Sequence, residues 1–251
     1  TYYKGNANNV NVTDKDNYKK FDLNTGTKKY EIFKDDTIKQ SVKDTASSNI
    51  KDSINRLDKR TIEINNRDDR LFKISKDFTN LNTSDRNNSI IVTATNRDKD
   101  YINDSVRNIL KDKGDLGKSI KINNKEFSVG EKIIFNKTDK LYDVKVAKND
   151  IGIIKDIKNN TVYATIDKRE VKFSINNYNN INYGYAKTTY KSQGETAKNV
   201  FVNIDTKQYN MNNRNDFYVK ISRAKEDITI YTDDKSKLLN NINNKQLKIS
   251  I

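Results

Sequence analysis

Apolar residues recur every three or four positions in the first part of the chain, which is the spacing of amphipathic helices. This spacing predicts helices over residues 36–57, 71–81 and 98–113. Between the last two lies the run SIIVTAT at 89–95, whose β-branched residues are typical of a buried parallel strand. A second short strand is expected at 61–64. The order strand, turn, helix indicates an α/β fold.

Between residues 127 and 181 the pattern changes to short runs in which apolar and polar residues alternate. Four such runs, at 132–136, 152–157, 161–166 and 170–175, are separated by turns rich in Asn, Asp and Lys. Period two over short strands predicts a small antiparallel β-barrel inserted into the α/β domain. After it, the chain resumes the first pattern, with strands expected at 200–204 and 228–232 and a helix at 216–224.

These patterns divide the chain into five segments. Residues 1–35 are a poorly specified N-terminal segment, and 36–126 form the first part of the α/β domain. Residues 127–181 form the barrel, 182–235 complete the domain, and 236–251 are a polar C-terminal tail. Because residue 1 is Thr and not Met, we expect a fragment of a longer protein.

The composition limits the kinds of functional site that the chain can form. His and Cys are both absent, so disulfides, thiolate–zinc sites and imidazole bases are excluded. The formal charge of +14 favours a polyanionic partner, although an AT-rich genome that enriches Lys and Asn would also produce a basic chain. No apolar run is long enough to span a membrane and no signal peptide is visible, so a cytoplasmic location is expected.

Two motifs near the C-terminus carry the functional information: GYAKTTYKSQGET at 184–196 and YVKISRAK at 218–225. They resemble the last two signature motifs of superfamily-one DNA helicases, in particular the RecD-like motor of conjugative relaxase-helicases. In that family the motifs run GYAxTxHKSQGxT and YVALSRA. The resemblance implies a RecA-like second motor domain, of the P-loop NTPase type, with a parallel sheet, flanking helices and an inserted small barrel that grips single-stranded DNA.

The first motif implies DNA-contacting residues. Thr188, Thr189 and Tyr190 offer hydroxyls to phosphate oxygens, and Lys191 adds a cation. Tyr190 stands where the family usually has His. The stretch that begins with TATN resembles another family motif and adds Thr95 and Asn96 as DNA contacts, although an ordinary capped helix explains that stretch equally well by itself.

The resemblance also implies nucleotide contacts. Gln193, Gly194 and Thr196 belong to the first motif, and Arg223 matches the arginine finger that stabilises charge on the transferring phosphate, which makes it the one catalytic candidate. Lys39 and Gln40 resemble an Arg-Gln pair that contacts nucleotide, with Lys in place of Arg. Lys220 replaces a small Ala of the family, so its helix is expected to be more exposed.

The phosphate-binding half of such a motor is missing from the sequence. GDLGKS at 114–119 has two residues between its glycines where the Walker A pattern needs four, and no Walker B strand is evident. No metal ligands are assigned. The motifs therefore predict the C-terminal half of an ATP-dependent 5′–3′ DNA helicase, inactive as an ATPase alone. Its expected partners are single-stranded DNA, no membrane, and a first motor domain that holds most of the ATP and Mg²⁺.

Two alternatives remain open from the sequence. The chain could be a non-catalytic remnant that binds single-stranded DNA, or a basic module that binds RNA or protein.

Overall fold

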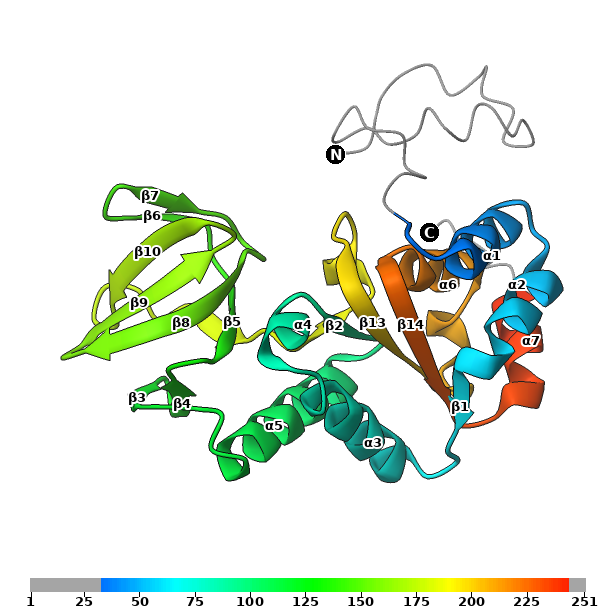
Figure 1. Ribbon diagram of the computed structural model, residues 1–251, viewed down its shortest axis with the longest axis horizontal. Coiled ribbons are helices and arrows are strands. Elements are labelled where there is room, and N and C mark those ends of the chain that lie inside the picture. The colour runs from blue at the N-terminus through cyan, green and yellow to red at the C-terminus, as the bar shows by residue number, and fades with distance from the viewer. Residues whose placement is uncertain (1–32, 244–251) are drawn as a thin grey trace, which may run out of the picture.

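The computed structural model describes residues 33–243, and these form a helix-flanked sheet with a second sheet inserted beside it (Figure 1). Nearly all of the predicted segment 1–35 and the end of the predicted tail, 244–251, lie outside the described residues.

The helix-flanked sheet has five parallel strands in the order β1-β14-β13-β2-β12. Its strands are β1 (Thr61–Glu63), β2 (Ile90–Thr93), β12 (Ala186–Thr188), β13 (Ala197–Ile204) and β14 (Ala224–Thr232). The long helices around it are α1 (Asp36–Ala46), α2 (Ile50–Leu57), α3 (Arg67–Thr79), α5 (Asn96–Asp112), α6 (Arg214–Ile221) and α7 (Lys235–Asn243). Shorter segments are α4 (Thr83–Asn87), η4 (Asp58–Arg60), η5 (Tyr190–Ser192) and η6 (Tyr209–Met211). The predicted parallel sheet with flanking helices is confirmed.

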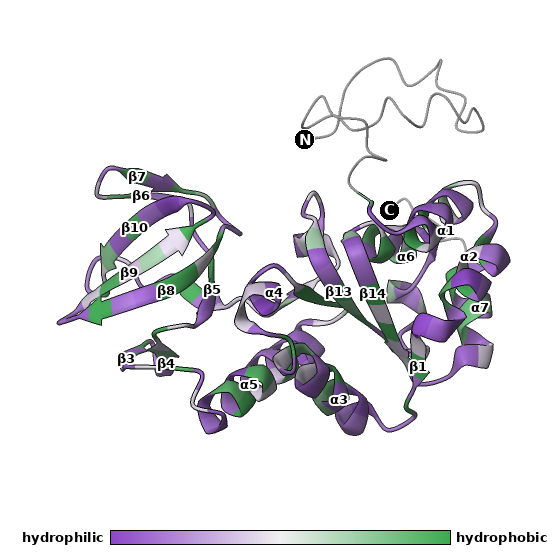
Figure 2. Cartoon of the chain, in the orientation of Figure 1, coloured by the Kyte–Doolittle hydropathy of each residue, from purple (hydrophilic) through white to green (hydrophobic). Residues whose placement is uncertain are grey.

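Alternation along the central strands assigns each helix to a face of this sheet. On β13, Val200 and Val202 belong to the cluster that contains apolar residues of α1, α2, α6 and α7. Phe201, between them, belongs to the opposite cluster with residues of α3 and α5, and its ring lies 5.8 Å from that of Phe78. Both faces are therefore covered, and Figure 2 shows hydrophobic residues gathered on β2, β13 and the inward sides of α3 and α5.

The insertion is a second five-stranded sheet in the order β10-β9-β8-β5-β11, antiparallel throughout. Its strands are β5 (Lys132–Phe135), β8 (Ile151–Lys158), β9 (Thr161–Ile166), β10 (Arg169–Ser174) and β11 (Ile181–Tyr183). Two hairpins accompany it, β3 (Ser119–Ile122) with β4 (Lys125–Ser128), and β6 (Asp139–Leu141) with β7 (Val144–Val146). Antiparallel strands are present as predicted, but the order is open at β10 and β11, so closure into a barrel stays a prediction.

Three sequence predictions about elements are corrected. The helix expected over 36–57 is two helices, because Ser48 adopts a left-handed conformation (φ 67°) and Asn49 N donates to Asp44 O at 2.8 Å, which ends α1. The tail expected from 236 begins with α7, whose Leu238 and Ile242 are buried. The helix expected over 216–224 ends at Ile221, so Arg223 lies in the turn before β14.

The prediction that Lys220 makes its helix more exposed is also wrong. Lys220 is fully buried, and its ammonium donates to Asn212 Oδ1 at 2.7 Å. Burial lowers the pKa of Lys220 to about 8, while the nearby Asp216 carboxylate opposes this shift. The long side chain therefore fills interior space and is satisfied there.

Polar side chains hold the insertion against the parallel sheet. The Lys132 ammonium at the start of β5 donates to the carbonyl oxygens of Asn87 and Ser89, at 3.0 and 2.7 Å. The Tyr185 hydroxyl donates to Glu131 Oε1 at 2.8 Å. Glu131 is fully buried, and burial raises the pKa of its carboxyl to about 7. These bonds fix the place where the chain leaves and re-enters the α/β domain.

Gly184 continues the antiparallel pairing of β11 with β5 at the point where the chain returns to the α/β domain. Its N–H donates to Lys132 O at 2.8 Å, and a Cβ on Gly184 would lie 2.9 Å from the carbonyl carbon of Ile133. Only a residue without a side chain allows this approach.

Candidate nucleic-acid and nucleotide site

The residues predicted to contact DNA lie together at one edge of the parallel sheet, the edge formed by the carboxyl ends of β2 and β12. β2 and β12 are neighbours, with Thr188 opposite Thr93, so both strands end at the same edge. Thr189 N donates to Thr93 O at 2.9 Å, which places the turn after β12 beside the start of α5. Thr95 and Asn96 thus come together with the segment 188–191, about 90 residues later in the chain.

These side chains differ in how far they face solvent. Tyr190 is 85% exposed, and Asn96 is exposed as well. Thr95 caps α5, because its Oγ1 accepts from Asp98 N at 3.1 Å, and its hydroxyl hydrogen remains able to donate outward. Thr189 is buried, and its hydroxyl donates to Thr93 O at 3.3 Å, so Thr189 positions the turn.

The edge is electropositive. Burial lowers the pKa of the Lys191 ammonium, and repulsion from Lys99 and Lys148 lowers it further, with Asp100 opposing. Lys99 of α5 and Lys148 of the loop before β8 therefore lie close enough to repel the charge of Lys191 on η5, although Lys99 also pairs with Asp100 at 3.1 Å. A cluster of cations that repel each other is stabilised when a phosphate backbone binds.

Arg223 connects the two sequence motifs. Its guanidinium is buried and donates to the carbonyl oxygens of Glu195 (2.8 Å), Val219 (2.8 Å) and, at a longer 3.4 Å, Ser192. The remaining nitrogen donates to Ser222 Oγ at 2.8 Å. Burial lowers the pKa of this guanidinium, with Tyr218 and Glu195 opposing. Arg223, the predicted finger, thus holds the loop that follows η5.

An ion pair that the motif spacing did not predict also holds the loop that contains Glu195. The Lys187 ammonium on β12 pairs with the Glu195 carboxylate, and Lys187 is 1% exposed. Burial lowers the pKa of Lys187, and Glu195 counteracts this effect. Both residues occupy variable positions of the family motif, so only the structure identifies them as partners.

The predicted nucleotide residues of the first motif lie on the outer side of this loop. Gln193, Gly194 and Thr196 are all exposed. Gly194 has a φ of 88°, and a Cβ there would meet no atom within 4 Å. The left-handed turn, and not crowding by this chain, is therefore what calls for glycine at 194.

The other predicted nucleotide pair lies on α1. Gln40 Nε2 donates to Asp44 Oδ1 at 2.9 Å, and Lys39 Nζ lies 3.9 Å from an Asp36 carboxylate oxygen. Both residues line a hollow of about 380 Å³ together with Lys43. Within residues 33–243, no hydrogen bond or ion pair joins Lys39 or Gln40 to the segment 184–196.

A larger cleft, of about 770 Å³, opens between the insertion and the parallel sheet. The insertion contributes Lys155 and Thr165 to its wall, and the α/β domain contributes Lys198, Lys225 and Thr196. Asp150, Asp167, Glu195 and Glu226 also line it, so the cleft carries charged side chains of both signs.

Two features of an ATP site, a group of metal ligands and a phosphate-binding loop at 114–118, are not found among the described residues. Across 33–243, no group of three or more acidic side chains is placed to hold a metal ion. The segment 114–118 lies between α5 and β3, so it does not begin a helix as a phosphate-binding loop does. None of the helices in this part of the chain is long and apolar enough to cross a membrane.

Comparison with known proteins agrees with this geometry. Residues 183–231 match the UvrD-like helicase C-terminal domain. The probable conjugal transfer protein TraA of Sinorhizobium fredii is 30% identical over 156 residues, which cover 59% of this chain and 14% of that protein. A conjugal transfer protein TraA of Agrobacterium fabrum is 28% identical over 151 residues, covering 57% of this chain and 13% of the relative. The chain thus spans about a seventh of these curated relatives.

Solved structures share the fold. The Bacteroides Pif1 helicase bound to single-stranded DNA aligns with a TM-score of 0.53 at 14% identity, covering 85% of this chain and 52% of that one. Pif1 helicase from Candida albicans aligns with a TM-score of 0.52 at 14% identity, covering 81% and 55%. The family match, 183–231, contains both sequence motifs, so the chain is similar to the C-terminal portion of superfamily-one helicases, and the solved structures share its fold.

Proposed function

We propose that this chain is the second motor domain of an ATP-dependent DNA helicase of the conjugative relaxase-helicase kind, which moves 5′ to 3′ along single-stranded DNA. The relatives in conjugal transfer support the biological setting, and the Pif1 complex with single-stranded DNA supports the ligand. A cytoplasmic location belongs to the same proposal.

The observation that supports this proposal most directly is the hydrogen bond from Arg223 to the Glu195 carbonyl. It joins the turn before β14, where the arginine finger is expected, to the loop that presents Tyr190 and Lys191. A motor must connect ATP turnover with its grip on DNA, and this contact brings the two candidate sites together.

ATP with Mg²⁺ supplies the phosphoryl transfer, and a first motor domain outside these residues holds most of both. This chain contributes the guanidinium of Arg223, which must leave the carbonyls of Ser192 and Glu195 to reach a phosphate. Gln193 and Thr196 on the exposed loop, with Lys39 and Gln40 on α1, are the further proposed nucleotide contacts. Thr95, Asn96 and residues 188–191 are proposed to bind the DNA backbone and bases.

The test is DNA-stimulated ATP hydrolysis after this chain is joined to a first motor domain encoded upstream. Arg223→Ala should remove turnover and spare DNA binding, while Arg214→Ala, in the same segment but bonded to Ser48, is the matched control. Salt-sensitive binding of single-stranded DNA without any turnover would support the non-catalytic remnant instead. A preference for RNA, or no nucleic-acid binding at all, would support the basic RNA- or protein-binding module.

A further inference from the structure

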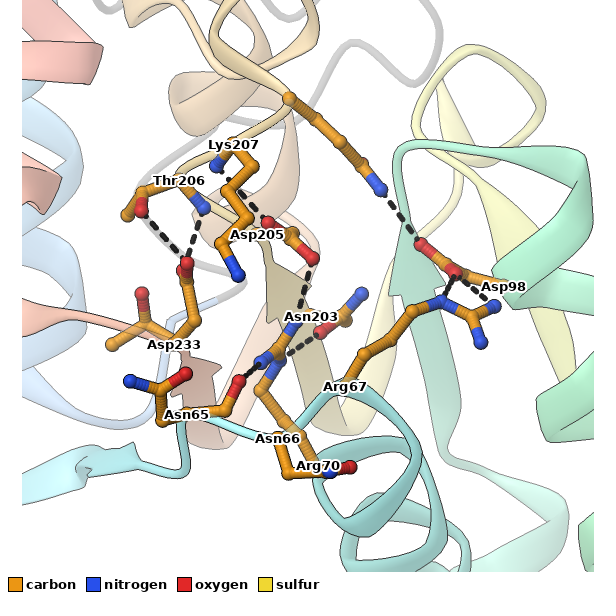
Figure 3. Close-up of polar contacts among 12 residues, drawn as sticks. Asn65, Asn66, Arg67, Arg70, Asp98, Asn203, Asp205, Thr206, Lys207 and Asp233 are labelled. Carbon is orange, nitrogen blue, oxygen red and sulfur yellow. Dashed lines mark hydrogen bonds and ion pairs between the residues drawn. The ribbon is translucent and has the colours of Figure 1, made fainter.

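The loop between β13 and α6, residues 205–213, is tied by polar bonds to α3, α5, α6 and α7 and to the turn after β14. Arg70 on α3 donates to Asp205 Oδ2 at 2.8 Å and to Asn203 Oδ1 at 3.1 Å, and Arg70 is fully buried. Thr206 donates through its N–H and its hydroxyl to the Asp233 carboxylate, at 2.6 and 2.9 Å. Figure 3 shows Arg70 reaching toward both Asn203 and Asp205, with Thr206 and Asp233 on the other side of the loop. The start of the loop is thus firmly anchored.

The end of the loop is anchored by the residue that departs from the family motif. The Lys220 ammonium donates to Asn212 Oδ1 at 2.7 Å. Asn212 Nδ2 in turn donates to the carbonyl oxygens of Asp205 (2.8 Å) and Gln208 (3.0 Å). Lys220 and Asn212 are 0% and 1% exposed. A buried ammonium without this acceptor would be costly, so the pair forces the loop to stay against α6.

The middle of the loop reaches the edge where the DNA candidates lie. Gln208 Nε2 donates to Asp98 Oδ2 at 3.1 Å, and Asp98 also accepts from Arg67 Nε at 2.9 Å. Asp98 lies in the first turn of α5, and its N–H is the donor that Thr95 caps. Figure 3 shows Arg67 directed at Asp98. One continuous series of bonds therefore runs from α6 through the loop to Thr95.

We propose that Lys220, Asn212 and Gln208 are positioning residues, which hold the 205–213 loop so that α6 and the first turn of α5 keep a fixed spacing. In the motor proposed above, and resting on that proposal, this spacing sets Arg223 relative to the DNA-binding edge. Lys220, which makes the bond to Asn212, stands where the resembled motif has Ala.

The test is amide hydrogen exchange of the 251-residue chain, which needs no motor activity. In Lys220→Met, which keeps the length and removes the donor, we expect exchange in 205–213 and in 96–99 to speed up about tenfold, as for the loss of one buried hydrogen bond. The insertion, 151–174, should exchange at its original rate. In Gln208→Leu only the 96–99 segment and the loop should speed up, with α6 unchanged.

Two results would overturn the proposal. One is faster exchange in Lys220→Met confined to α6, which would show that the loop does not depend on this bond. The other is a uniform increase over the whole chain including 151–174, which would show a merely structural role. Neither result bears on whether the chain is part of a motor, so failure here and failure of the proposed function are distinguishable.

Discussion

Glu195 receives a hydrogen bond from Arg223 on its backbone carbonyl, at 2.8 Å, while its carboxylate pairs with the buried ammonium of Lys187. One residue is thus held by two cations, one from the turn before β14 and one from β12. If Arg223 moves toward a nucleotide, Lys187 still holds the side chain of Glu195. The loop can therefore lose its hydrogen bond to Arg223 and still be held by the ion pair with Lys187.

The Lys187–Glu195 pair should be asymmetric in its effect on stability. Glu195→Gln leaves the nearly fully buried Lys187 ammonium without its carboxylate, and we expect a loss of about 1–3 kcal/mol in the free energy of unfolding. Lys187→Met should cost less, because the remaining Glu195 is 33% exposed and reaches water. Urea unfolding of both variants and the double variant measures the coupling. Additive effects would show that the pair does not form in solution.

Substitution at Gly184 should loosen the junction between the two sheets. The new Cβ of Gly184→Ala would lie 2.9 Å from the backbone of Ile133, so the strands must move apart at a cost of about 1–3 kcal/mol. Gly117→Ala is the control, because its Cβ would come no closer than 3.3 Å to Val129. Equal thermal unfolding temperatures for the two variants would contradict the close contact between Gly184 and the backbone of Ile133.

The buried Glu131 should make stability depend on pH. Its pKa is raised by burial to about 7, above the usual 4.5, so its stabilising contribution is complete below pH 4.5 and is lost as pH rises through 7. Glu131→Gln removes this loss. The stability of the variant relative to the original chain should therefore rise between pH 4.5 and pH 8, by on the order of 3 kcal/mol. Lys132 titrates in both proteins, so its effect cancels in the difference, and a pH-independent difference would contradict the raised pKa.

Tyr190 should contribute to DNA affinity and not to stability, because 85% of it is exposed. Under the proposed function, Tyr190→Ala weakens binding of single-stranded DNA by about 1–3 kcal/mol through lost stacking, and Tyr190→Phe retains most of the affinity. Fluorescence anisotropy with a labelled oligonucleotide measures both variants. Unchanged affinity in Tyr190→Ala would remove this residue from the interface.

Periodicity was enough to predict most of the parallel sheet and its helices. The β-branched run at 89–95 and the apolar run at 200–204 became the central strands β2 and β13, because a strand covered on both faces needs continuous apolar residues. The break between α1 and α2 could not be predicted, since it lies at Ser48, a residue other than Gly in a left-handed conformation, and the apolar spacing continues across it.

Motif spacing likewise found the loop but not its supports. The family resemblance assigned the segment 184–196 and Arg223 to one nucleotide site; Arg223 does bond to the segment, and the nucleotide role stays a prediction. Motif spacing did not find Lys187 with Glu195, or Lys220 with Asn212, because a buried lysine has no periodic signature and its partner is chosen by the fold. Charged residues directly before an apolar run, such as Glu131 and Lys132 before Ile133, are a sequence signal for buried polar contacts of this kind.

The most direct test of the proposed function is the rate of DNA-stimulated ATP hydrolysis by this chain joined to its first motor domain. If Arg223 completes the ATP site, Arg223→Ala should lower kcat by about 10³–10⁵ while the affinity for single-stranded DNA stays within about twofold. Hydrolysis at the original rate in Arg223→Ala would contradict the account.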